Sequence, residues 1–209
     1  DTGLQSLKLD PDNPETLRYM GQAYLGLGRE GLAKMAIDRA FQMYTGDAAQ
    51  GMGATPTDGG PVRKAYEQRA ARGGGTARGV RAESLDRDAG LAQIFYLYGM
   101  ISLKNGDKGT VEAREHFKSA VKYRPDYAEA WANRANVLFD LKRTDEAFNS
   151  WQQALAIKSD FVEALISRAN ALNELGRAAE AIADYEKMLA LDPAQNYVSG
   201  MLVHAKMHC

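Results

Sequence analysis

The sequence predicts an all-α protein built from repeated pairs of helices. The main observation is a period of about 34 residues, on which Ala128-Glu129-Ala130-Trp131 aligns with Val162-Glu163-Ala164-Leu165. A second observation is the regular alternation of small and large apolar residues at helical spacing within each period. A third is the recurrence of helix-ending signals at matching places. Because each pair buries its apolar faces against its neighbours, we expect a solenoid.

Four units along the chain follow this pattern. The first full unit runs from Pro14 to Thr45, and the second has a first helix predicted from Phe95 to Leu103. The last two units begin at Ala128 and Val162. A period of about 34 residues with this order of small and large residues resembles the tetratricopeptide repeat, which implies helix-turn-helix pairs in a right-handed superhelix.

The chemistry of the repeat explains its helix boundaries. Small residues such as Ala147 allow two helices to approach closely, and large ones such as Trp151 fill the space towards the next pair. The turn Leu175-Gly176-Arg177 ends a first helix, because glycine accepts the left-handed backbone there. Proline closes the second helix of several units, but Ser159 stands at that place in the third.

The sequence divides into four expected segments. They are 1–45, a partial repeat plus one full repeat; 46–90, an irregular Gly/Arg-rich insertion or flexible linker; 91–193, three repeats; and 194–209, the start of a junction to a missing C-terminal domain. Because Leu4–Pro11 matches only the end of a second helix, we expect the chain to be a fragment that begins within a repeat.

The insertion has too few large apolar residues to order itself. Pro61–Arg72 is its stretch with a helix signal, since proline is favoured in a first helical turn. Arginine and glycine together also suit contact with nucleic acid or an acidic partner. Interspersed acidic residues dilute that charge, so a loop between repeats is the preferred interpretation. A frame error in the gene is a third explanation that the sequence leaves open.

Composition excludes several classes of partner. The chain has 26 basic and 27 acidic side chains, and this balance favours neither nucleic acid nor an anionic membrane surface. No apolar run approaches the roughly 20 residues that span a bilayer. The single cysteine fits a reducing compartment. The predicted location is therefore the cytoplasm, with no nucleic acid and no membrane among the partners.

Candidate binding residues lie on the first helix of each pair, which forms the inner wall of such a solenoid. Asparagine there can donate to and accept from the backbone of an extended peptide of any sequence. The alternative is that these amides bond to neighbouring parts of the same fold. The predicted peptide-binding residues are Asn133, Asn136, Asn170, Ser167, Asn173, Asp140 and Glu174.

Two arginines and three glutamates complete the expected inner wall. Arg134 and Arg168 are predicted to lie between helices and reach Asp140 or Glu174, with ligand contact as the alternative. A clamp for a peptide carboxylate is disfavoured, because an acid occupies the second position of three repeats, at Glu15, Glu129 and Glu163.

No catalytic or metal site is predicted in this chain. His204 and His208 lie four residues apart beside Cys209, a spacing that a helix would place on one face. No third group of ligands accompanies them, and Ala205 stands where zinc proteases of the His-Glu-x-x-His type carry glutamate. A small metal-binding protein is therefore only a third hypothesis.

The last two repeats and the terminal stretch YVSGMLVHAKMHC resemble bacterial proteins similar to O-linked N-acetylglucosamine transferases. The resemblance implies a solenoid that recruits protein substrates through a ladder of asparagines. Asn133, Asn136 and Asn170 match that ladder, and Ser167 departs from it. It also implies a missing catalytic domain, a UDP-sugar-dependent protein O-glycosyltransferase with UDP-N-acetylglucosamine as donor. No cofactor is expected in this segment.

The predicted function is a scaffold that binds extended peptide or protein clients in its concave groove, as the substrate-recruiting arm of such a transferase. The alternative is a stand-alone adaptor without an enzymatic domain. Exposed apolar residues near Phe139 and Ile166 also leave a homo-oligomer open.

Overall fold

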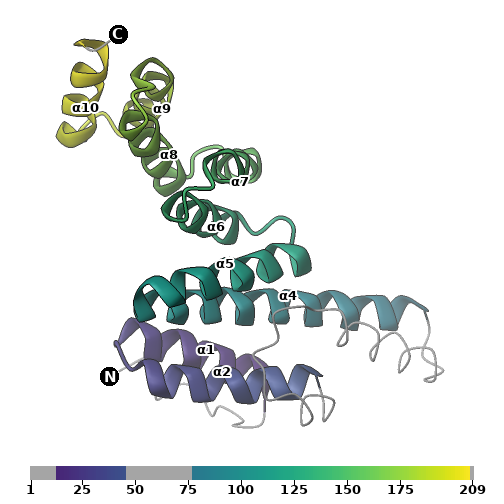
Figure 1. The fold of residues 1–209 in the computed structure, drawn as a ribbon. Coiled ribbons are helices and arrows are strands. Elements are labelled where there is room, and N and C mark those ends of the chain that lie inside the picture. Colours follow the sequence, from purple (N-terminus) through teal and green to yellow (C-terminus); the bar gives the residue numbers. More distant parts are fainter. Residues whose placement is uncertain (1–12, 46–76, 208–209) are drawn as a thin grey trace. The chain divides into compact units, whose positions relative to one another are not determined.

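The computed structural model describes residues 13–45 and 77–207, with the backbone alone for 77–85. Every regular element in these ranges is a helix, which confirms the predicted all-α class (Figure 1). The elements are α1 (Pro14–Gly26), α2 (Glu30–Thr45), α4 (Ala77–Ser102), η2 (Leu103–Asn105), α5 (Gly106–Tyr123), α6 (Ala128–Asp140), α7 (Thr144–Ile157), α8 (Val162–Glu174), α9 (Ala178–Leu191) and α10 (Asn196–Met207).

The chain divides into two compact units, Asp1–Pro125 and Asp126–Cys209. The described part of the first unit contains α1, α2, α4, η2 and α5, and that of the second contains α6 to α10. The boundary falls inside the range 91–193, which the sequence groups as three consecutive repeats. Within the units, α1 packs against α2, α4 against α5, α6 against α7 and α8 against α9.

The turns inside the α1–α2, α6–α7 and α8–α9 pairs each contain one residue with a positive φ angle. Gly28 and Gly176 have φ angles of 68° and 71° in the two Leu-Gly-Arg turns, a region that favours glycine. Lys142 takes the corresponding place between α6 and α7 with φ 59°. Among the described residues it is the one non-glycine residue with a positive φ, so this turn carries backbone strain that the other two avoid.

The core of the first unit is built from aromatic rings. Phe95 of α4 stacks on Tyr123 of α5, with ring centroids 5.5 Å apart. His116 packs against the same Phe95 and lies 5.4 Å from the ring of Tyr98. The Tyr98 hydroxyl donates to Oδ1 of Asp38 on α2 over 2.6 Å, and burial beside that carboxylate raises the pKa of Tyr98. His116 is thus a packing residue of the core.

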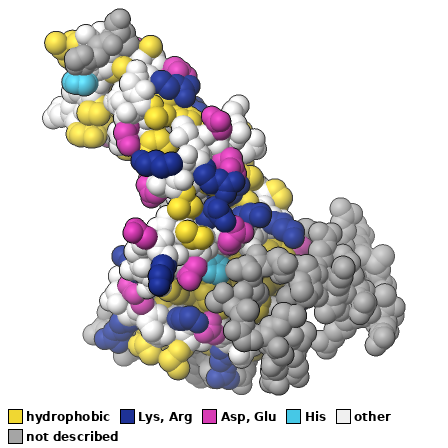
Figure 2. Space-filling model, viewed as in Figure 1, with side chains coloured by type: hydrophobic (Ala, Val, Ile, Leu, Met, Phe, Trp, Pro, Cys, Tyr) yellow, Lys and Arg dark blue, Asp and Glu magenta, His cyan; other side chains and the backbone are white. Residues whose placement is uncertain are grey.

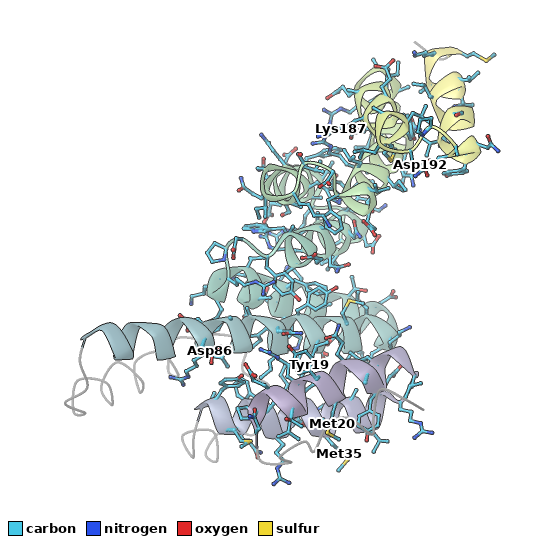
Figure 3. The ribbon with its side chains drawn as sticks, turned by 180° about the vertical axis from the view of Figure 1, so that it is seen from behind. Tyr19, Met20, Met35, Asp86, Lys187 and Asp192 are labelled. Atoms are coloured by element: carbon cyan, nitrogen blue, oxygen red, sulfur yellow. The ribbon has the colours of Figure 1, made fainter. Side chains whose placement is uncertain are left out.

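Helix α2 shows how the first unit separates core from surface. Ile37 and Ala40 are fully buried, and α2 packs against both α1 and α4. Met35 is 69% exposed and its side chain points away from that core (Figure 3). The Cγ1 atom of Ile37 leaves no room for a side chain at Gly21 of α1, since a Cβ there would lie 2.6 Å away.

Helix α4 begins earlier than the sequence predicts. Its first residue is Ala77, so residues 77–90 are helical, although they fall in the range expected to be irregular. The predicted helix Phe95–Leu103 is only its C-terminal part. Alanine, arginine, glutamate and leucine, all good helix formers, account for much of this extension. Residues 46–76, including the possible helix Pro61–Arg72, lie outside the described residues, as does Leu4–Pro11.

The second unit shows the predicted alternation of small and large residues. Ala135 of α6 and Ala147 of α7 are fully buried, and Trp151 is 1% exposed beside them. Tyr185 stands one repeat period after Trp151 and is also 1% exposed, in a cluster formed by α8, α9 and α10. Each aromatic ring therefore fills the space that neighbouring alanines leave.

Helix α10 keeps the register of the repeat. It packs against α9, and its buried residues are Val198 and Ala205. These stand one repeat period after Ala164 and Ala171, two buried residues of α8. The range 194–209, expected to begin a junction, thus contains a helix that packs in the manner of another first helix.

Candidate functional site

One face of α6 carries four polar side chains at helical spacing. Glu129, Asn133, Asn136 and Asp140 are separated by four, three and four residues, which places them along one side of the helix. All four reach solvent to some extent. The same arrangement recurs one repeat period later on α8, as Glu163, Ser167, Asn170 and Glu174. We call these two sets the α6 row and the α8 row.

The two rows belong to neighbouring helices. Helices α6 and α8 contact each other, and Nζ of Lys142, in the turn after α6, lies 3.7 Å from Oε1 of Glu174. Partial loss of solvent raises the pKa of Asp140, Lys142 lowers it and the charge of Glu174 raises it further. Asp140 and Glu174 are therefore close enough to repel each other.

Asn136 supports the fold. Its Oδ1 accepts a hydrogen bond of 3.0 Å from Nε1 of Trp151. The indole group can only donate, and Trp151 is almost completely buried, so it needs an acceptor inside the protein. One of the predicted binding amides is thus engaged by the second helix of its own pair.

Asn173 has the equivalent role in the next pair. Its Nδ2 donates to the Tyr185 hydroxyl over 2.6 Å. Trp151 and Tyr185 occupy equivalent positions in the two repeats. The polar atom is the indole nitrogen in Trp151 and the hydroxyl oxygen in Tyr185, and these atoms lie at different places on the two side chains. The amides that reach them differ accordingly, since Asn136 corresponds to Asn170 and not to Asn173.

The centre of the α8 row has no such partner. Asn170 is exposed and Ser167 is half-buried, and neither forms a hydrogen bond with any described residue. Asn133, at the corresponding place of the α6 row, is half-buried. Of the predicted amides, Asn170 is the one that presents its donor and acceptor atoms to solvent without a role in packing.

The two arginines reach other partners than the sequence predicts. Nη1 of Arg134 donates to Oγ of Ser150 over 2.6 Å. Arg168 binds Asp184 through two hydrogen bonds of 2.8 and 2.5 Å. The prediction of Asp140 and Glu174 as partners was wrong, because each arginine points towards the second helix packed behind it. The signal in the sequence is a spacing of sixteen residues that occurs in both pairs.

Charge over the described surface is mixed in sign. Figure 2 shows Lys and Arg side chains interspersed with Asp and Glu. Lys187 on α9 and Asp192 at the end of that helix are two of the charged residues seen in Figure 3. Neither sign covers a large continuous area in the view of Figure 2.

The described residues contain no group of three His, Cys, Asp or Glu side chains placed to hold a metal ion. His204 is exposed on α10, whereas His208 and Cys209 lie outside the described part. None of the described helices combines the length and the apolar character needed to cross a membrane.

Comparison with known families agrees with the repeat pattern. One tetratricopeptide-repeat model matches residues 111–161, and another matches residues 162–195. No curated protein matches the chain in sequence.

Solved structures share the fold. MamA superposes with a TM-score of 0.57 at 19% identity, over 90% of this chain and 82% of that one. The tetratricopeptide domain of Arabidopsis OM64 gives 0.53 at 23% identity, over 58% and 99%. The first such domain of Spaghetti (RPAP3), solved with the HSP90 peptide SRMEEVD bound, gives 0.52 at 25% identity, over 57% and 96%. The chain therefore contains tetratricopeptide repeats and has the all-helical fold of tetratricopeptide-repeat proteins.

Proposed function

We propose that the chain is a protein-interaction scaffold whose second unit binds extended peptide or protein segments along the α6 and α8 rows. The observation that carries this proposal is Asn170. Its amide is exposed at the centre of the α8 row, without a hydrogen bond to any described residue. An amide both donates and accepts, and therefore matches the backbone of an extended peptide.

Two further features support a binding role. Ser167 lies one helical turn before Asn170 and adds a hydroxyl that makes no hydrogen bond within the described chain. In addition, the similar domain of Spaghetti (RPAP3) was solved with a peptide bound, so this fold can hold a peptide ligand. The amides of Asn136 and Asn173 contribute indirectly, because they fix the second helices behind the rows.

The proposal is tested by binding of short unstructured peptides to the purified chain. A randomised peptide array identifies binders, and fluorescence anisotropy then measures their affinity for the wild type and for Asn170→Ala. Loss of one or two hydrogen bonds is expected to weaken binding about fivefold to tenfold.

Asn149→Ala is the matched control. Asn149 is also an exposed asparagine in the middle of a helix, but it belongs to α7, the second helix of its pair. This variant should bind as the wild type does. Equal losses in both variants, or no binder in the array, would contradict the proposal.

A finer proposal concerns the parent protein. The terminal segment from Tyr197 resembles the junction of O-linked N-acetylglucosamine transferase-like proteins, and on that basis we propose that the rows recruit substrates for a sugar transferase that uses UDP-N-acetylglucosamine. The coding sequence after Cys209 tests this idea. A nucleotide-sugar-binding domain is expected there, whereas a stop codon would leave the alternative of a stand-alone adaptor.

A further inference from the structure

We infer that the client of the α6 and α8 rows is an extended segment rich in lysine or arginine, an inference that rests on the function proposed above. Both rows begin and end with an acid and carry neutral polar groups between them. Glu129 and Glu163 stand at the N-terminal end, and Asp140 and Glu174 stand at the C-terminal end. A peptide held by the central amides therefore lies between two sets of carboxylates.

Few Lys or Arg side chains of the described chain form ion pairs with these carboxylates. Glu129, Asp140 and Glu163 form no ion pair with any described residue. Within the described residues Lys142 pairs with Glu174 alone, at 3.7 Å, and its side chain is 79% exposed. A cation supplied by a client would thus face acids that are still unpaired.

The nearby arginines cannot fill this role. Arg168 is engaged by both carboxylate oxygens of Asp184 on α9, the second helix of the pair. Arg134 also reaches the second helix of its pair, where its Nη1 donates to the hydroxyl of Ser150 on α7. The rows therefore keep a negative balance even though the chain as a whole is close to neutral.

The negative charge of the rows also disfavours acidic peptides and nucleic acid as clients. An acidic peptide of the SRMEEVD type would place its carboxylates beside Glu129, Glu163 or Asp140, where like charges repel. Nucleic acid is disfavoured for the same reason. Basic protein segments satisfy both features of the rows, since their backbone meets the amides and their side chains meet the acids.

The length of the rows gives a spacing for the client's cations. The separation between Glu129 and Asp140, three helical turns, corresponds to about 16 Å along a helix. An extended peptide covers that distance in about five residues. Two basic side chains about five residues apart can therefore reach both ends of a row at once.

The experiment compares three labelled peptides by fluorescence anisotropy with the purified chain. They share one backbone and differ only at two positions about five residues apart, which hold lysine, glutamine or glutamate. At low salt the lysine peptide is expected to bind about threefold to tenfold more tightly than the glutamine peptide, and the glutamate peptide more weakly than both. Added salt should reduce these differences.

Variants then locate the effect. Glu163→Gln combined with Glu174→Gln should reduce the preference for lysine, and Glu129 and Asp140 of the α6 row should account for the remainder. The control combines Glu112→Gln on α5 with Glu186→Gln on α9, which changes the net charge equally at exposed glutamates outside the rows. This control should keep the preference, because loss of the exposed Glu186–Lys206 pair has little effect on stability.

Lys142→Gly provides a test in the opposite direction. It removes the cation beside Glu174 and places glycine where Gly28 and Gly176 stand in the other turns, so the fold should tolerate it. The lysine peptide should then bind about twofold to threefold more tightly. Weaker binding of that peptide to this variant would overturn the inference.

The outcomes separate the two proposals. If the lysine and glutamine peptides bind equally well and both depend on Asn170, the rows do bind peptides and the inferred charge preference is wrong. Tighter binding of the glutamate peptide would also refute the preference. If none of the three binds, and the array gives no binder, the proposed function itself fails.

Discussion

Replacing Asn136 with alanine is expected to destabilise the second unit, whereas the same replacement at Asn170 is not. The two residues stand in equivalent places of consecutive repeats. Only the first bonds to a buried aromatic group, through the 3.0 Å hydrogen bond from Trp151. Structural and binding roles can therefore be separated with two matched substitutions.

The magnitudes follow from that contact. Asn136→Ala leaves the indole N–H of Trp151 without an acceptor in a place that is 1% exposed, which costs about 1–3 kcal/mol. Alanine recovers roughly 0.5 kcal/mol through its better helix propensity. The net loss is about 0.5–2.5 kcal/mol. For Asn170→Ala only the gain in helix propensity applies, so the free energy of unfolding should rise by roughly 0.5 kcal/mol.

The assay is urea unfolding followed by tryptophan fluorescence. Both tryptophans of the chain, Trp131 and Trp151, lie in the second unit, so the signal reports that unit alone. For a unit of this size a change of 1 kcal/mol corresponds to about 4–8 °C in the melting temperature, which gives a second readout.

A control separates the lost hydrogen bond from lost volume. Asn136→Asp keeps an oxygen acceptor at the same place and should retain more stability than Asn136→Ala. Equal stability changes in Asn136→Ala and Asn170→Ala would refute the reasoning, as would an Asn136→Ala protein as stable as the wild type.

Three further predictions concern stability. Asp184→Asn should cost about 1–3 kcal/mol by urea unfolding, because it removes the charge that holds Arg168 on a carboxylate that is only 5% exposed; a smaller loss than in an exposed ion pair would contradict this. Burial lowers the pKa of His116, so the fold favours the neutral imidazole. Protection of the α4 and α5 amides from hydrogen exchange should therefore be constant above about pH 6.5 and fall as the pH drops below that value. A His116→Phe variant should lose this pH dependence. The same exchange measurement should show that Gly31→Ala raises the free energy of unfolding by up to about 1 kcal/mol, since an added Cβ has no neighbouring atom within 4 Å. Gly109→Ala should lower it by about 1–3 kcal/mol or more, because the added Cβ would lie 1.8 Å from a carbonyl oxygen of α4.

Helix ends that depend on local chemistry could be predicted from the sequence. Pro14 and Thr45 bound the first observed pair, and Asn13 caps it by accepting a 2.8 Å hydrogen bond from the Glu15 amide. The glycine turns were equally visible, because only glycine adopts a positive φ at low cost. Lys142 shows the limit of such signals, since the same turn forms there without glycine.

Contacts between helices were less predictable. The partners of Arg134 and Arg168 depend on which side chain of the second helix stands behind each guanidinium group, and a single repeat does not reveal this. The start of α4 was missed for a related reason. Its first residues lack an apolar stripe, so the periodicity that identifies other helices is absent there, and helix propensity alone is a weak signal.

In the two helix pairs of the second unit, the aromatic residue of the second helix engages a different amide of the first helix. Trp151 presents a donor that Oδ1 of Asn136 accepts, so the oxygen of that amide already has a structural role. The Tyr185 hydroxyl instead accepts a hydrogen bond from Asn173, which lies about one helical turn after Asn170 on α8. Asn170 itself stays exposed. A ladder of asparagines read from sequence alone therefore includes amides that also form hydrogen bonds within the fold. In these two pairs the amide that bonds internally differs with the aromatic residue of the second helix, because a buried polar atom on the ring needs a hydrogen-bond partner inside the fold.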